Sequence, residues 1–138
     1  ETAEKIRALF RQSYAVEAEL LRAVDFPPLK RPLRDYMNST NDFYGLWEAE
    51  RLIAAVEVDH SGDATHIQSL VVHPEFFRKG LGGRLLEFVF DAYDSKAFTV
   101  ETGLDNEPAK ALYKKYMFRE VSRWDTDHGV RKVRFERK

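Results

Sequence analysis

The chain has 138 residues, which is enough for one domain that buries roughly two thirds of the surface exposed by its unfolded form. Hydrophobic residues make up 43% of it, charged residues 33%, and the formal net charge is −1. This balance is typical of an ordinary globular protein and not of a disordered or membrane chain, and it does not imply a large nucleic-acid footprint. Cysteine is absent, so disulfides, thiolate metal sites and cysteine nucleophiles are excluded. We expect one cytoplasmic domain over residues 1–138, and no cluster of metal ligands stands out.

The N-terminal part predicts two helices and a hairpin. Residues at helical spacing predict a first helix from about Thr2 to Val24: Ile6, Leu9, Phe10, Ser13, Val16, Leu20 and Val24. Three prolines in "DFPPLKRP" end that pattern, and "LRDYMNST" allows a short second helix. Two strands, Phe43 to Ala49 and Arg51 to Asp59, then form a tight hairpin closed by Ser-Gly-Asp.

The second half alternates strands and helices. Apolar residues on both faces of "THIQSLVVH" predict a central strand that is covered on both sides. An amphipathic helix begins at Leu81, "AFTVETG" is a further strand, and "NEPAKALYKKY" is a helix capped by Asn106. Strands near Phe118 to Trp124 and Val130 to Arg137 follow, around the turn "DTDHG". The order predicts an α/β fold with a mixed central sheet and flanking helices.

The segment "HPEFFRKGLGGRLLEFVF", from His73 to Phe90, joins the central strand to the amphipathic helix. Glycines at 80, 82 and 83 allow a sharp turn and a close approach of the backbone N–H groups to a ligand. The start of the helix adds the positive end of its dipole, and Arg78 and Lys79 add full charges. This combination is suited to a diphosphate.

Other glycine loops bind phosphate, and two of them fail here on spacing. A P-loop requires Gly-Lys-Ser/Thr, whereas this chain has Gly82-Gly83-Arg84. The dinucleotide fingerprint requires a third glycine where this chain has Leu85. The remaining alternative is that the glycines only ease a tight strand-to-helix connection.

A second segment, "NEPAKALYKKYMF", makes the interpretation of the glycine segment more specific. Together they resemble the GNAT family of acyl-CoA-dependent N-acetyltransferases, in which a Gln/Arg-x-x-Gly-x-Gly/Ala loop is followed by Asn-x-x-Ala-x-x-Leu/Phe-Tyr-x-x-x-Gly-Phe. The first motif is matched by Phe77-Arg78-Lys79-Gly80-Leu81-Gly82. Five residues match the second: Asn106, Ala109, Leu112, Tyr113 and Phe118. The resemblance spans roughly residues 43 to 122, including the order of strands and helices.

Three departures from the family pattern stand out. Phe77 replaces a Gln or Arg and removes one side-chain donor, which Arg78 or Lys79 would replace. Met117 stands where the family usually has Gly. Family members also open with a strand ahead of the first helix, and this sequence opens inside that helix, so the first edge strand of the sheet is expected to be trimmed or absent.

The resemblance implies an acetyl-CoA site. The backbone of Leu70, Val71 and Val72 would pair with the pantetheine arm like an added strand. The pyrophosphate would be held by Arg78, Lys79, Gly80, Leu81, Gly82 and Gly83, and Asn106 would touch the cofactor between two splayed parallel strands.

Acetyl transfer requires proton transfer both at the attacking amine and at the departing sulfur. A free amine attacks the thioester, and the departing thiolate belongs to a thiol with a pKa of about 8.5, so Tyr113 is a candidate to donate a proton to the sulfur and to contact the cofactor. A packing role for Tyr113 is the alternative. Gln68 and Ser69 are not useful bases, which leaves Glu57, sharing a strand face with Ile53 and Ala55, and Glu101, sharing one with Thr99. His66 and His73 are weaker candidates.

The acceptor is expected to be a primary amine, bound near "DFPPLKRP" and "DTDHG", where Asp25, Tyr36, Tyr44 and His128 are candidate lining residues. The alternative to an enzyme is a non-catalytic acyl-CoA-binding or regulatory module of the same fold. No nucleic-acid or membrane partner is expected. An exposed strand edge near the C-terminus would permit a homodimer.

Overall fold

The computed structural model describes residues 2–127 and 129–138. The helices are α1 (Thr2–Leu21), α2 (Leu33–Met37), α3 (Leu81–Ala92) and α4 (Glu107–Lys115), with two 3₁₀ turns, η1 (Pro27–Lys30) and η2 (Pro74–Phe76). The strands are β1 (Asp42–Glu48), β2 (Arg51–Asp59), β3 (Thr65–Val72), β4 (Phe98–Gly103), β5 (Arg119–Asp125) and β6 (Arg131–Arg137). In this part of the chain no helix is both long and apolar enough to cross a membrane.

The strands form one mixed sheet in the order β1-β2-β3-β4-β6-β5. Only β3 and β4 run parallel, because α3 crosses over between them, and the other neighbours are antiparallel. One face packs on α3 and α4, with Val56, Leu85 and Val133 in its core. The other packs on α1 and α2, through Leu9 and Val71 among others. The predicted α/β fold with a mixed central sheet is confirmed.

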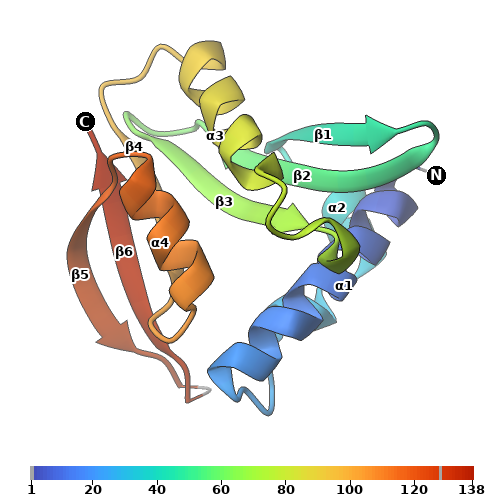
Figure 1. Ribbon diagram of the computed structural model, residues 1–138, viewed down its shortest axis with the longest axis horizontal. Coiled ribbons are helices and arrows are strands. Elements are labelled where there is room, and N and C mark those ends of the chain that lie inside the picture. Colours follow the sequence, from blue (N-terminus) through green and yellow to red (C-terminus); the bar gives the residue numbers. More distant parts are fainter. Residues whose placement is uncertain (1, 128) are drawn as a thin grey trace.

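The sheet opens between β3 and β4. Their pairing covers only Thr65 to Ile67 on β3 and Phe98 to Val100 on β4. Figure 1 shows the two arms diverging beyond that point, with β1–β3 in one arm and β4–β6 in the other. The later residues of β3, 68–72, therefore have no strand on their β4 side, and their backbone groups must bond elsewhere.

A bulge lies where the sheet begins to open. Along the β2–β3 ladder Glu57 pairs with Ser69 while Val58 pairs with Ile67, so Gln68 is the additional residue. A bulge bends its strand and reverses which face each later side chain points to. Ile67 accordingly packs in the α3 core, whereas Val71 packs under α1.

A second irregularity corrects one expectation about Glu57. Ala54 pairs with Leu46 and Leu52 with Trp47, which leaves Ile53 as the additional residue of β2. Ile53 packs in the α3 core, while Ala55 packs under α1. The expectation that Glu57 shares a face with both was therefore wrong for Ile53.

Left-handed residues follow the ends of α1 and α4. The first helix ends at Leu21, three residues before the predicted end, and Arg22 has φ 54°. Met117, just past α4, has φ 73°. This is the position where the related family usually has Gly, and a glycine would adopt the same conformation without the steric cost that a side chain brings.

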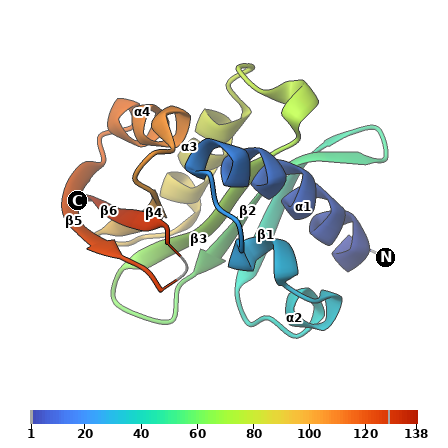
Figure 2. The same ribbon diagram turned by 90° about the horizontal axis from the view of Figure 1, so that it is seen from below.

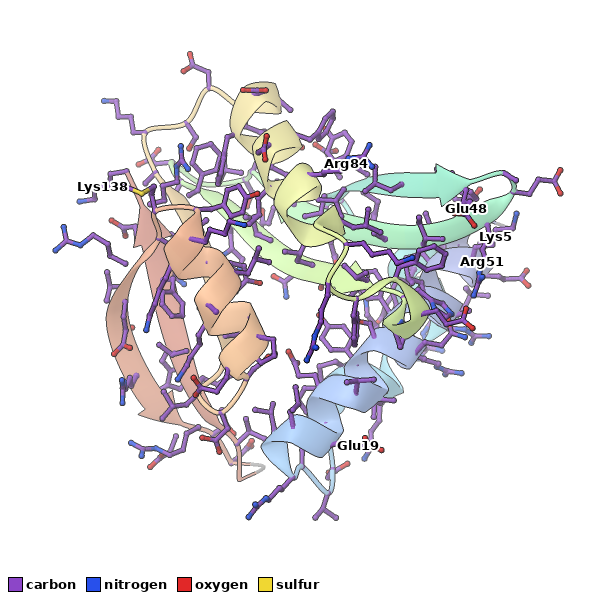
Figure 3. The ribbon with its side chains drawn as sticks, in the orientation of Figure 1. Lys5, Glu19, Glu48, Arg51, Arg84 and Lys138 are labelled. Atoms are coloured by element: carbon purple, nitrogen blue, oxygen red, sulfur yellow. The ribbon has the colours of Figure 1, made fainter. Side chains whose placement is uncertain are left out.

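Charged side chains lie near both ends of α1. Lys5 Nζ donates to the Glu50 carbonyl oxygen at 3.2 Å, which ties the start of α1 to the β1–β2 turn. Figure 3 shows Lys5, Glu48 and Arg51 together there, and Glu19 near the other end of the helix. Figures 1 and 2 agree that this C-terminal end of α1 lies beside the start of α4.

Candidate active site

The glycine loop leaves a set of backbone donors without partners. Gly80 caps α3 in the left-handed conformation, with φ 78°, and no side chain caps the helix. The first hydrogen bond of α3 runs from Arg84 N to the Gly80 carbonyl oxygen at 3.1 Å. The amides of residues 81–83 therefore precede the intrahelical ladder and are free to bind an anion. Arg78, itself at φ 64°, and Lys79 are exposed beside this turn.

Two of the glycines also allow α3 to pack closely. A Cβ atom on Gly82 would lie 3.0 Å from Leu112 Cδ2 and 3.9 Å from Leu70 Cδ2. One on Gly83 would collide with the hydroxyl of Tyr116, which donates to Glu87 at 3.2 Å. The glycines of this loop therefore serve the packing of α4 as well as any ligand.

Between the two arms of the sheet, α1, β4 and α4 bring together a polar cluster, in which Thr102, Asn106 and Tyr113 are buried and Tyr14 and Glu17 are half-buried. Asn106 Nδ2 donates to Glu17 Oε1 at 2.7 Å, and Thr102 Oγ1 lies 3.4 Å from the same oxygen. Burial raises the pKa of Glu17, although the hydrogen bond from Asn106 and the charge of Lys132 oppose that rise. A carboxylate with a raised pKa is suited to accept a proton near neutral pH.

Asn106 lies at the opening between the strands, as the family resemblance implies, and is only 7% exposed. Its Oδ1 accepts from Ala109 N at 3.2 Å and so caps α4, while its Nδ2 donates to Glu17. Both the nitrogen and the oxygen of this side-chain amide thus have partners within the protein. Its geometry favours orienting Glu17 over direct contact with a cofactor.

Tyr113 is buried at 5% exposure, and its ring packs edge-on against Phe118 with centroids 5.6 Å apart. Burial raises the pKa of its hydroxyl, and the charge of Glu17 and the neighbouring Tyr14 add to the rise. The hydroxyl therefore stays protonated. Among the described residues it makes no hydrogen bond, which leaves its proton available to a ligand.

Glu57 is almost fully buried and its two oxygens are occupied. They accept from Arg31 Nη1 and Nη2 at 2.7 and 3.0 Å, from Asn41 Nδ2 at 2.9 Å and from Ser69 Oγ at 3.2 Å. Protonating Glu57 would break a bidentate ion pair, so these contacts favour a structural role.

Glu101 accepts from Arg134 Nη1 at 2.6 Å and is partly exposed. His66 lies on the adjoining strand, where its Nδ1 is 2.8 Å from Thr99 Oγ1, and burial lowers its pKa. His73 accepts from Glu75 N and caps η2. The structure thus gives each of these three residues a partner within the protein.

A pocket of about 310 Å³ lies next to the polar cluster. Its lining is mostly apolar and comes from α1, η1, β4 and β6: Glu17, Leu21, Phe26, Pro27, Pro28, Arg31, Gly103, Val130 and Lys132. This is the region expected for an acceptor from "DFPPLKRP". Asp25, Tyr36 and Tyr44 are not among its lining residues; their contacts are with Lys30, Arg31 and Tyr93, respectively. His128 lies outside the described residues.

Glu17 is the functional candidate that sequence reasoning missed. The signal was present, because Phe10, Tyr14, Glu17 and Leu21 follow one another at spacings of four, three and four residues. These spacings place one carboxylate within an apolar stripe of α1. A charge in such a stripe needs a partner from another element, and here Asn106 supplies it.

Comparisons with solved structures agree with this fold. The PaiA N-acetyltransferase of Thermoplasma acidophilum, solved in complex with coenzyme A, superposes with a TM-score of 0.76 at 18% identity, over 99% of this chain and 92% of that one. The ribosomal-protein-S18-alanine N-acetyltransferase of Escherichia coli gives 0.72 at 22% identity, over 99% and 88% of the two chains. At these identities the likeness shows the fold.

The sequence also matches curated proteins and a family model. UPF0157 protein YqkA of Bacillus subtilis is 33% identical over 129 residues, which are 93% of this chain and 38% of YqkA. Uncharacterized protein ML0378 of Mycobacterium leprae is 29% identical over 92 residues, 64% of this chain and 26% of that protein. The chain thus spans well under half the length of both relatives. The model of the acetyltransferase (GNAT) family matches residues 4–118, and the chain belongs to that family.

Proposed function

We propose that this domain transfers the acetyl group of acetyl-CoA to a primary amine within a ternary complex. One observation carries the proposal: the uncapped start of α3 and the unpaired edge of β3 lead into the same opening that holds Glu17 and Tyr113. The first two features suit a diphosphate and an amide-bearing arm, and the last two suit proton transfer.

The residues present fit acetyl-CoA along its length. The amides of 81–83 and the charges of Arg78 and Lys79 would hold the pyrophosphate, and Gly80 gives the turn its left-handed geometry. Backbone groups of Leu70 to Val72 would bond the pantetheine amides, since β4 does not pair with them. When bound, acetyl-CoA supplies the activated acetyl thioester.

Two side chains of this chain would assist the transfer, one at the attacking amine and one at the departing sulfur. Glu17 would accept one from the acceptor's ammonium group, because burial gives this carboxyl a raised pKa and Asn106 fixes its orientation. Tyr113 would donate a hydrogen bond from its hydroxyl to the departing sulfur, because its raised pKa keeps that hydroxyl protonated. The occupied oxygens of Glu57 and Glu101 make those two carboxylates the weaker proposals for the base.

The function is tested by separating binding from turnover. Calorimetry with desulfo-CoA measures cofactor binding, and release of free thiol from acetyl-CoA in the presence of amines measures transfer. We expect saturable binding and amine-dependent thiol release. Binding without thiol release from any amine would favour the alternative, a non-catalytic acyl-CoA module, and absence of binding would contradict both. A homodimer through the exposed β5 edge also stays a prediction.

Replacing Tyr113 with Phe removes the hydroxyl and keeps the ring that packs on Phe118. We expect kcat to fall by about 10²-fold, the lower end of what a positioned proton donor contributes. The dissociation constant of coenzyme A should change little. An unchanged kcat in stopped-flow thiol release would remove Tyr113 from the mechanism and leave it as a packing residue.

A further inference from the structure

The pocket beside Glu17 carries information about the acceptor. Its volume of about 310 Å³ is near the lower limit for small-molecule sites. Leu21, Phe26, Pro27, Pro28 and Val130 give it an apolar wall. A compact acceptor with an apolar body fits such a space, and its amine would approach the carboxylate of Glu17 at the inner end.

Of the two positively charged side chains that line the pocket, only one has an anionic partner within hydrogen-bonding distance in the part of the chain that the structure describes. Arg31 lines it, but the guanidinium is already neutralised by a bidentate pair with Glu57 and lies over the ring of Tyr36, 4.2 Å from the centroid. Lys132 also lines it, and among the described residues its ammonium group makes no hydrogen bond or ion pair within 4.0 Å. Once Glu17 has engaged an amine, the pocket therefore retains one uncompensated positive charge.

From this imbalance we infer that the acceptor carries a carboxylate, which Lys132 binds while Glu17 receives the amine. The acceptor is then a free amino acid with an apolar side chain, or a similar small amino carboxylate. This inference rests on the proposed function and concerns the same site. An amine without an anionic group would make no contact with the charge of Lys132, which is half-buried in the pocket lining.

Matched acceptors test this inference. Phenylalanine, phenylalaninamide and 2-phenylethylamine share one apolar body, and only the first has a carboxylate; leucine, leucinamide and isopentylamine form a second set. For the unmodified protein we expect kcat/KM to be at least about tenfold higher for the amino acids, the worth of one charge-assisted contact. Equal or better use of the amides and plain amines would overturn the inference.

Variants then assign the contact to one residue. Lys132→Met should raise KM for the amino acids by about tenfold and leave KM for the plain amines unchanged. Lys138→Met is the matched control, because Lys138 lies on the same chain segment beyond the end of β6, far from the pocket lining, and should change neither value. An equal rise in KM for both classes would contradict a carboxylate contact.

The outcomes also separate this inference from the proposed function. The charge of Lys132 lowers the pKa of Glu17, so its loss raises that pKa further, but this effect acts on kcat for every acceptor alike. Thiol release that is indifferent to the carboxylate overturns the inference and leaves the acetyltransferase proposal standing. Absence of thiol release with every amine overturns the acetyltransferase proposal itself.

Discussion

Glu17→Gln is expected to lower kcat by at least about 10²-fold and, at the same time, to raise the melting temperature near neutral pH. The glutamine keeps the shape of the side chain and an oxygen that accepts from Asn106 Nδ2, but it cannot take a proton. Cofactor affinity should be unchanged, because Glu17 lies on α1 and the phosphate loop lies at the start of α3.

The gain in stability follows from the direction of the pKa shift. Burial raises the pKa of Glu17 in the folded chain above its unfolded value of about 4.3. The stability contributed by this group is therefore fully present below the unfolded pKa and is lost as pH rises through the folded pKa. Glutamine resembles the protonated carboxyl at every pH, so the variant escapes that loss.

Thermal melts across pH check the linkage. The melting temperatures of the two proteins should coincide below about pH 4; the advantage of the variant should grow as pH rises from the unfolded pKa to the raised folded pKa of Glu17, and should level off above it. Glu19→Gln is the matched control, because Glu19 is exposed on the same helix and does not line the pocket. A variant with full kcat, or one that is less stable at neutral pH, would remove Glu17 as the base.

The glycine loop shows what the sequence could supply. Backbone geometry there is local: a left-handed residue at Gly80 and an uncapped helix start at Leu81 follow from the residue types themselves. Helices and strands were likewise predicted within a few residues, since periodicity depends on which side chains face the core. The local features of the proposed cofactor site can therefore be predicted from the sequence.

The polar cluster shows what the sequence could not supply. Glu17 and Asn106 are 89 residues apart, and their contact depends on how far β3 and β4 separate. The separation begins beside a bulge at Gln68, which no residue type in "HIQSLVV" indicates. Glu57 looked like a base because the pattern showed burial, and only the tertiary structure places Arg31 against it.

Gly82→Val should abolish detectable binding of coenzyme A. We expect a branched side chain at this position to hinder the close approach of a phosphate to the amides of residues 81–83, which precede the intrahelical ladder. Losing two charge-assisted hydrogen bonds costs at least about 3 kcal/mol, which is more than a hundredfold in the dissociation constant. Calorimetric titration with desulfo-CoA measures the loss directly.

The same substitution also disturbs packing, because a Cβ atom at Gly82 would lie 3.0 Å from Leu112 Cδ2. The double variant Gly82→Val, Leu112→Ala separates the two effects, since it removes the atom that the new side chain meets inside the protein. If the loop holds the pyrophosphate, the double variant still fails to bind, whereas Leu112→Ala alone binds normally. Recovery of binding in the double variant would mean that the defect is one of packing between α3 and α4, and the phosphate site would then have to lie elsewhere.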